Sequence, residues 1–212
     1  MEILKREYRE AWRFLMRLKR YIIISASLYI LAAVAAYFVS AEIYSKDAAL
    51  IKEHLEIFNG IIDSTGVADE QGNLNAVTLF FYNFRAASMA IGAGMMPFVF
   101  APIFNCVTNG AVIGIMLSIL HATSAGGITE MAVSILPHGV FEITALLLSI
   151  AFGLKLCAEV NSAVSAKSSI HDVFQYVSEM ARAIVLTVLP LLILAALTES
   201  YITPVFIERF IK

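Results

Sequence analysis

The chain alternates between long apolar stretches and short polar segments, and this pattern predicts its elements. Apolar residues dominate 21–40, 77–104, 137–160 and 182–199, and each stretch is close to the ~20 residues with which a helix crosses the hydrocarbon of a bilayer. Residues 110–122 are equally apolar but form a shorter stretch. The pattern therefore predicts an all-α fold, a polytopic helical membrane bundle of about five transmembrane helices.

Residues 128–136 are apolar but too short to span a membrane, so we expect a re-entrant half-helix there. Such a break is tolerated only where protein or a water-filled cavity surrounds the backbone. Pro137 follows directly, and proline suits the first turn of a helix because its missing N–H has no intrahelical partner there. We therefore expect Pro137 to begin the fourth spanning helix.

Amphipathic segments of opposite charge flank the first spanning helix. Residues 1–20 interleave basic with apolar and aromatic side chains at helical spacing, which is typical of a helix in an anionic membrane surface, with Trp12 among the headgroups. The same basic residues orient the first span with its N-terminus in the cytoplasm. Residues 41–76 are mainly acidic and contain an amphipathic helix over about 46–63. We expect them to form an extracytoplasmic helical segment of a single membrane domain, residues 21–212.

Composition agrees with a membrane protein. The 212 residues are 59% hydrophobic and 15% charged, against about 25% charged residues in soluble domains, and the mean hydropathy is +0.80. One membrane domain uses up this length, so no separate soluble catalytic domain is expected. Cys106 and Cys157 lie in or near apolar stretches and are expected to be small buried side chains. We expect a multi-pass protein of the cell membrane, in contact with membrane lipids and not with nucleic acid.

Ionisable side chains in the apolar stretches are the candidates for function. Such a side chain is expensive inside a membrane and normally points into the bundle, where it finds partners. His138 and Glu142 stand one helical turn apart and share a face. The predicted topology brings Glu199, His121 and Arg85 to the same outer level. Imidazole and carboxylate groups suit zinc and similar ions, so one interpretation is a divalent metal held by His138, Glu142 and Glu199, with His121 as a further ligand.

Two other interpretations of these side chains remain open. Arg85 is expected to pair with Glu142 or Glu199, and this ion pair would serve only to lock the bundle. Alternatively, His138 and Glu142 belong to a proton- or ion-linked transporter or a channel, whose pathway the interrupted segment 128–136 would line.

Enzymatic chemistry has little support in the sequence. His-x-x-x-Glu is not the His-Glu-x-x-His arrangement in which two imidazoles hold zinc beside a glutamate base. No catalytic residue is assigned, and an intramembrane metal-dependent hydrolase is the third interpretation.

Small residues on two predicted spans offer surfaces for close helix packing. Ala90, Gly92 and Gly94 form one such face, and Gly110 and Gly114 form the other in a Gly-x-x-x-Gly arrangement. We expect these faces to pack helices together, and either one is a candidate contact of a homodimer.

Four short strings of residues occur in order along the membrane core, residues 77–205. They are Asn83-Phe84-Arg85-Ala86-Ala87, Asn109-Gly110-x-x-x-Gly114, Leu136-Pro137-His138-Gly139-x-x-Glu142 and Ala196-x-x-Glu199. Together they resemble the stage II sporulation protein M family of integral membrane proteins. One departure is that the family's more common Asn-Asn pair before the arginine is here Tyr82-Asn83, with Phe84 intervening. The matched positions carried over from the family are Arg85, Asn109, His138, Glu142 and Glu199, and we expect Asn83, Arg85 and Asn109 to form a structural polar set.

The resemblance implies a multi-span membrane component without enzymatic activity. In spore formers the namesake works with two peptidoglycan-degrading proteins during engulfment and anchors or positions them. The first interpretation of the whole chain is therefore a non-enzymatic membrane scaffold, a homodimer whose outer segment 41–76 docks extracytoplasmic partners. A transporter or channel is the alternative.

Overall fold

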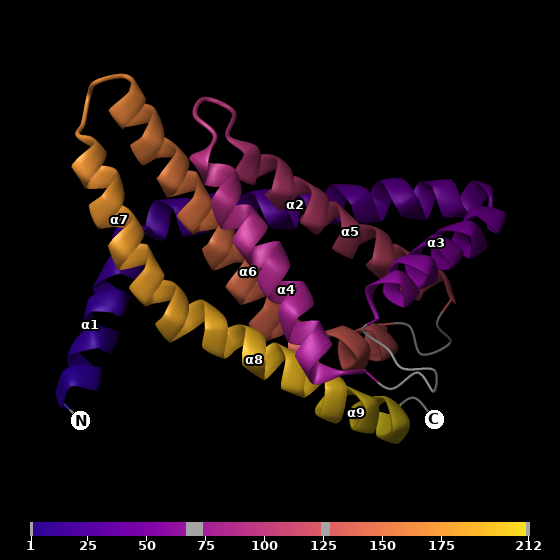
Figure 1. The fold of residues 1–212 in the computed structure, drawn as a ribbon. Helices are drawn as coiled ribbons and strands as arrows, with labels where there is room; N and C mark the ends of the chain where they lie inside the picture. Colours follow the sequence, from indigo (N-terminus) through magenta and orange to yellow (C-terminus); the bar gives the residue numbers. More distant parts are fainter. Residues whose placement is uncertain (1, 67–73, 124–127, 211–212) are drawn as a thin grey trace.

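Helices account for almost all of the part of the chain that this computed structural model describes, residues 2–66, 74–123 and 128–210 (Figure 1). The long helices are α1 Glu2–Arg17, α2 Lys19–Lys46, α3 Ala49–Thr65, α4 Ala76–Gly92, α5 Ala101–Thr123, α6 Ile128–Val164, α7 Ile170–Ala183, α8 Leu189–Leu197 and α9 Thr203–Phe210. A 3-10 turn, Ala93–Met95, extends α4, and π-helical segments at Ile184–Val188 and Thr198–Ile202 join α7, α8 and α9 into one long rod.

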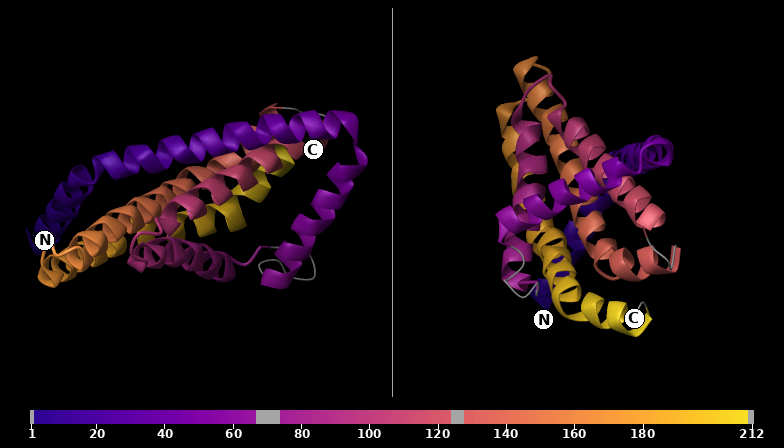
Figure 2. Two further views of the ribbon diagram at one scale, coloured as in Figure 1. Left: turned by 90° about the horizontal axis from the view of Figure 1, so that it is seen from above. Right: turned by 90° about the vertical axis from the view of Figure 1, so that its right-hand side faces the viewer.

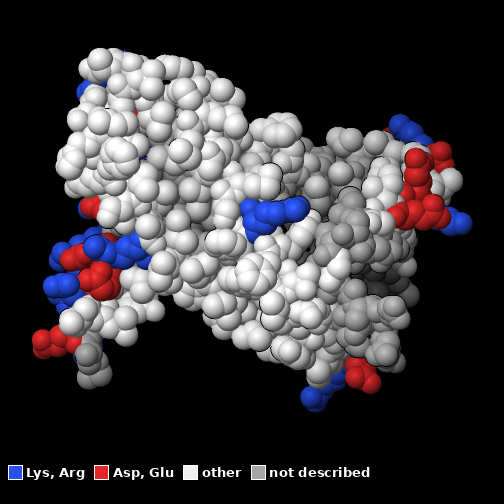
Figure 3. All heavy atoms as spheres, viewed as in Figure 1, with Lys and Arg blue, Asp and Glu red and all other residues white. Residues whose placement is uncertain are grey.

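Four helical stretches are long and apolar enough to cross a membrane, and they confirm the predicted all-α membrane bundle. They are Lys19–Lys46, Ala101–Thr123, Ile135–Val164 and Ile170–Phe210. α4 has 17 residues, and Arg85 is its only charged one. In Figure 3, most charged side chains gather toward the ends of the molecule and leave a broad uncharged surface between them, which suits the hydrocarbon of a bilayer.

Local signals explain where two of these helices begin. The Asn75 side chain accepts hydrogen bonds from the N–H groups of Val77 and Thr78, so it caps the first turn of α4. Ser169 and Asp172 form a capping box at the start of α7. Both caps occupy N–H groups that would otherwise lack a partner at the helix end.

The α2–α3 hairpin and the turn between α6 and α7 lie at opposite ends of the molecule (Figure 2). α2 and α5 run side by side in the same direction, because Cys106 contacts the Ser25 carbonyl and Gly114 packs against Ala33. At the α6–α7 end, the Phe98 N–H donates to Asn161 Oδ1 at 2.7 Å and joins the turn after α4 to α6. This arrangement is compatible with the predicted path, in which α4 and α6 run opposite to α2 and α5.

The predicted second and third spans are wrong in their boundaries. The helix expected over 77–104 ends at Gly92, and α5 begins at Ala101, well before the expected start at 110. Residues 96–100 form the turn instead, since Pro97 and Pro102 disfavour continued helix, and Phe98 and Phe100 take positive φ angles of 63° and 47°. The turn is as apolar as its flanks, so the hydrophobic pattern could not locate it.

The predicted half-helix at 128–136 is also wrong as a separate element. α6 runs unbroken from Ile128 to Val164 and carries Pro137 inside it, so Pro137 does not begin the helix. A proline removes one backbone hydrogen bond, which a membrane helix tolerates when its neighbours satisfy the freed group. His138 and Glu142 therefore lie well inside a 37-residue helix and not at its first turn.

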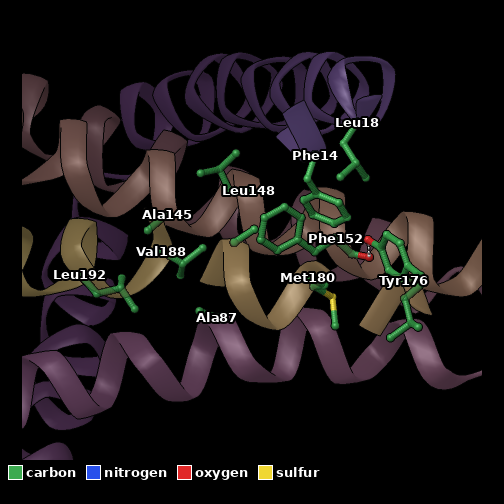
Figure 4. Close-up of a cluster of buried hydrophobic side chains, with 12 residues drawn as sticks. Phe14, Leu18, Ala87, Ala145, Leu148, Phe152, Tyr176, Met180, Val188 and Leu192 are labelled. Atoms are coloured by element: carbon green, nitrogen blue, oxygen red, sulfur yellow. Dashed lines mark hydrogen bonds between the residues drawn. The ribbon is translucent and has the colours of Figure 1, made fainter. Parts of the chain in front are cut away.

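A cluster of buried apolar side chains attaches the N-terminal helix to the bundle (Figure 4). The Phe14 ring lies 5.7 Å from that of Phe152 and 5.6 Å from that of Tyr176, and the Tyr176 hydroxyl donates to the Phe152 carbonyl at 2.9 Å. Leu18 packs in the same cluster. α1 is therefore docked on α6 and α7, while Trp12 on its other face remains 64% exposed.

The small-residue faces are used for packing within the chain. A Cβ on Gly110 or Gly114 would collide with the backbone of α2 at Tyr29 and Ala33, and a Cβ on Gly94 would collide with the backbone at Gly153 of α6. Gly92 differs, since a Cβ there would meet nothing within 4 Å. Gly94, Gly110 and Gly114 therefore pack helices within one chain, while a homodimer stays a prediction.

Candidate metal centre and polar chamber

His138, Glu142 and Glu199 converge in the interior of the bundle. α6 places His138 and Glu142 one turn apart on the same face. Glu199 comes from the π-helical segment Thr198–Ile202, which lies beside this part of α6. One potential ligand atom from each residue lies within 4.8 Å of the other two, and all three residues are only partly exposed. Three protein ligands of this kind suit zinc and leave a fourth position for water or a ligand.

The π-helical segment explains how Glu199 reaches α6. Pro204 lacks an N–H and its ring crowds the carbonyl of the preceding turn, so a regular α-helix is disfavoured there. The chain widens instead, and the Thr203 N–H bonds to the Thr198 carbonyl, five residues earlier. Such bulges frequently occur at functional sites because they change which residues share a face.

Thr203 holds the imidazole of His138. Its hydroxyl lies 3.3 Å from Nδ1 of His138, and Thr203 is buried. This contact occupies one ring nitrogen and leaves Nε2 for a metal. Ligating histidines almost always bond a second group in this way, which fixes the ring and its tautomer.

His121 lies apart from this cluster, so its assignment as a further ligand is wrong. Its Nδ1 is hydrogen-bonded to the Tyr37 hydroxyl, and the two rings stack with centroids 6.0 Å apart. The parallel packing of α5 on α2 carries His121 toward the end of α2, and its side chain is exposed there. The prediction that His121 lies at the same outer level as His138 did not take the register of α5 on α2 into account.

Arg85 is not paired with a carboxylate of the cluster. Among the described residues the structure records no ion pair between Arg85 and Glu142 or Glu199. Arg85 is exposed, and its guanidinium lies 5.6 Å from the centroid of the Tyr82 ring. The expected ion pair, and with it the interpretation that such a pair locks the bundle, is wrong.

A cavity of about 230 Å³ connects Arg85 to the cluster. We call it the polar chamber; its walls come from α4, α5, α6 and α8, and its polar lining consists of Tyr82, Asn83, Arg85, Asn105, Asn109 and Glu142. Asn83 is buried, and its Nδ2 has no hydrogen-bond partner among the described residues. Asn109 donates to the carbonyl and side-chain oxygens of Asn105 and does not cap its helix, because α5 begins eight residues earlier.

Comparison with known proteins identifies the family. The sequence profile of stage II sporulation protein M matches residues 25–204. The chain belongs to the stage II sporulation protein M family. The matched range includes all three cluster residues, Thr203 and the whole polar chamber.

A curated protein similar to this chain is the uncharacterised protein MJ0793 of Methanocaldococcus jannaschii. It is 28% identical over 112 residues, which cover 53% of this chain. The chain covers 62% of the length of that relative. No solved structure matches the chain.

The sequence pattern did not point to Thr203, which contributes to the site. Thr203 follows Glu199 by four residues, so a search for polar residues at helical spacing around each candidate ligand would have found it. Asn105 lies between the apolar stretches 77–104 and 110–122, so the predicted spans leave it outside a helix. With the correct boundary, Asn105 and Asn109 stand one turn apart on one helix face.

Proposed function

We propose that this member of the stage II sporulation protein M family is an integral membrane scaffold that holds a divalent metal, such as zinc, at His138, Glu142 and Glu199. The observation that carries the metal assignment is the convergence of one imidazole and two carboxylates inside an apolar bundle. Two carboxylates at such close range repel each other, and both are costly to hold in a membrane. A divalent cation would compensate both.

The absence of another compensating charge supports this assignment. Among the described residues, no Lys or Arg forms an ion pair with Glu142 or Glu199. The Thr203 hydroxyl supports His138 from behind, as expected for a ligand whose orientation matters. The metal would tie α6 to the α8–α9 rod and fix the shape of the bundle.

Metal analysis of the purified chain tests the site. We expect about one zinc or similar ion per chain, lost in His138→Ala and retained in His121→Ala, which removes an imidazole that stands outside the cluster. Absence of stoichiometric metal from the unmodified protein would contradict the proposal. Retention of the metal by His138→Ala would contradict it equally.

The scaffold role rests on family membership and on the outer segment. The acidic residues 41–76 include α3, which projects at the end of the molecule away from the α6–α7 turn (Figure 2). We propose this segment as the docking surface for extracytoplasmic peptidoglycan-degrading partners. Co-purification of such enzymes with the full chain, lost on deletion of 41–76, is expected. Equal recovery after the deletion would contradict this docking surface.

A transport function is the second candidate, and the polar chamber favours it. The chamber carries polar groups from the exposed Arg85 to Glu142 in the middle of the bundle. Ion or solute flux in liposomes that is lost in Glu142→Gln would favour transport over the scaffold. Absence of ion or solute flux in liposomes that contain the unmodified protein would exclude the transport function.

A further inference from the structure

The polar chamber holds a buried hydrogen-bond donor without a partner. Asn83 is 7% exposed, lines the chamber, and its Nδ2 makes no hydrogen bond within the described part of the chain. A buried amide left unpaired costs free energy, so an unsatisfied group in a native structure needs an explanation. A bound ligand that accepts this hydrogen bond would provide one.

Arg85 adds a positive charge to the same chamber. It is the only Lys or Arg in the sequence of residues 53–154. The sequences of α4 and α5 contain no other Lys, Arg, Asp or Glu. In Figure 3 a small group of basic atoms interrupts the uncharged surface in the middle of the molecule. An isolated cation in a membrane bundle is costly and points to a functional site, and its expected partner is an anion.

The remaining polar groups fit an oxygen-rich anion. Asn109 donates to Asn105 Oδ1 at 3.3 Å and to the Asn105 carbonyl at 2.9 Å, and Asn105, whose amide also carries donor N–H groups, lines the chamber. Glu142 on the α6 wall is the one carboxylate of the lining, and it would repel an anion. It is also a ligand of the proposed metal, which would neutralise it.

We propose that the polar chamber binds a phosphate group, with Arg85 and Asn83 as its donors and the metal on its Glu142 side. This inference rests on the proposed function, because the metal offsets the charge of Glu142. The guanidinium fork of arginine matches phosphate oxygens, and amide N–H groups supply the remaining bonds. The volume of about 230 Å³ accommodates several waters or one phosphate group, since a water occupies roughly 30 Å³. The group comes from a membrane lipid that enters past the exposed Arg85 or from free phosphate.

Binding to the full metal-loaded chain in a phosphate-free maltoside detergent tests the proposal. The probes are short-chain phosphatidic acid and inorganic phosphate, with the matching diacylglycerol as the lipid without phosphate. Native mass spectrometry or calorimetry reports the affinity. We expect Arg85→Gln and Asn83→Leu each to weaken phosphate binding at least tenfold. Arg209→Gln, which removes an exposed arginine on α9, is expected to leave it unchanged.

The two sources of phosphate give different results. Binding of phosphatidic acid but not of inorganic phosphate assigns a lipid, whereas competition by inorganic phosphate assigns the free ion. No binding of either probe, or equal affinity in Arg85→Gln, Asn83→Leu and Arg209→Gln, overturns the proposal.

Metal content measured on the same samples separates this inference from the proposed function. If the samples contain about one metal ion per chain but bind no phosphate, the proposed phosphate site is overturned and the metal site is not affected. Phosphate binding that depends on Arg85 and Asn83 in a chain without metal supports the chamber as a phosphate site, but overturns both the metal site and the stated need for a metal beside Glu142.

Discussion

The cluster is built from residues whose roles depend on the turn of helix that carries each one. His138 and Glu142 come from regular helix, and Glu199 reaches them only because a π-helical segment precedes Pro204. His121, also an imidazole near the end of an apolar stretch, bonds Tyr37 on α2 instead. Both His138 and His121 are candidate metal ligands by residue type. The register of their helices places only His138 in the cluster.

Thr203 should control metal affinity without being a ligand. Thr203→Val keeps the side-chain shape and removes the hydroxyl 3.3 Å from His138 Nδ1. Loss of such a supporting bond typically weakens metal binding about 10–100-fold, and we expect a decrease in that range in a zinc competition titration. Thr187→Val, which removes a hydroxyl that donates to the Ala183 carbonyl, is the control. Equal zinc affinity of the two variants would contradict this role.

Gly114 is expected to be indispensable for the contact between α2 and α5. Its Cα faces the Ala33 carbonyl so closely that an added methyl group must push the helices apart. Gly114→Ala should lower the free energy of unfolding by about 1–3 kcal/mol, the usual cost of overpacking. Gly92→Ala, where the methyl group meets nothing within 4 Å, should cost much less. Thermal unfolding in detergent measures both, and equal midpoints would contradict the packing argument.

At the scale of elements, α1 is more than a surface helix. Its Phe14 is buried against α6 and α7. Side chains of α1 also form ion pairs with residues of α7. Arg182 bonds Glu7 at 2.9 Å and also Glu10, and Arg17 pairs with Glu179. The acidic residues of this basic helix thus serve the protein contact, while Trp12 and the basic side chains stay exposed. Unlike Arg6 and Arg17, the basic residues Lys5, Arg9 and Arg13 have no ion pair recorded among the described residues. Together with Trp12 they are the groups expected at an anionic membrane surface.

Removing the Arg182 ion pairs should loosen α1 without unfolding the bundle. Partly exposed pairs contribute up to about 1 kcal/mol, so Arg182→Gln should raise hydrogen exchange of α1 amides roughly five-fold. The effect should shrink at high salt, which screens such pairs. Arg9→Gln removes an exposed charge for which no ion pair is recorded in the described part of the chain, and should leave the exchange unchanged. Equal exchange in both variants would mean that the apolar contacts alone hold α1.

At the scale of the whole molecule, the α2–α3 end and the α6–α7 end should face opposite sides of the membrane (Figure 2). Basic residues concentrate in residues 1–20, so the α6–α7 end, on which α1 docks, is expected inside. Membrane-impermeant maleimide should label Ser45→Cys in intact cells and Ser165→Cys only after permeabilisation. Cys106 and Cys157 are fully buried and give the unlabelled background. The reverse labelling pattern would contradict the orientation.

The fold class and most of the candidate ligands could be predicted from the sequence, because they depend on local properties. Apolar length identifies spanning helices, and i,i+4 spacing alone places His138 and Glu142 on one face. The end of α4 at Gly92, the start of α5 at Ala101 and the continuity of α6 through Pro137 could not be read in this way, because proline-containing turns and proline-containing helices share the same apolar composition.

The sequence by itself determined that this chain is a helical membrane protein with costly ionisable groups inside it. The tertiary structure decided which of those groups meet. A π-helical turn brings Glu199 to His138 and Glu142, whereas His121 and Arg85 lie outside this cluster. Thr203 contacts His138, and Asn83 lines the neighbouring polar chamber. The physical reason is that desolvation makes each buried polar group require a partner, but the identity of that partner follows from helix register and packing, which connect residues distant in the chain.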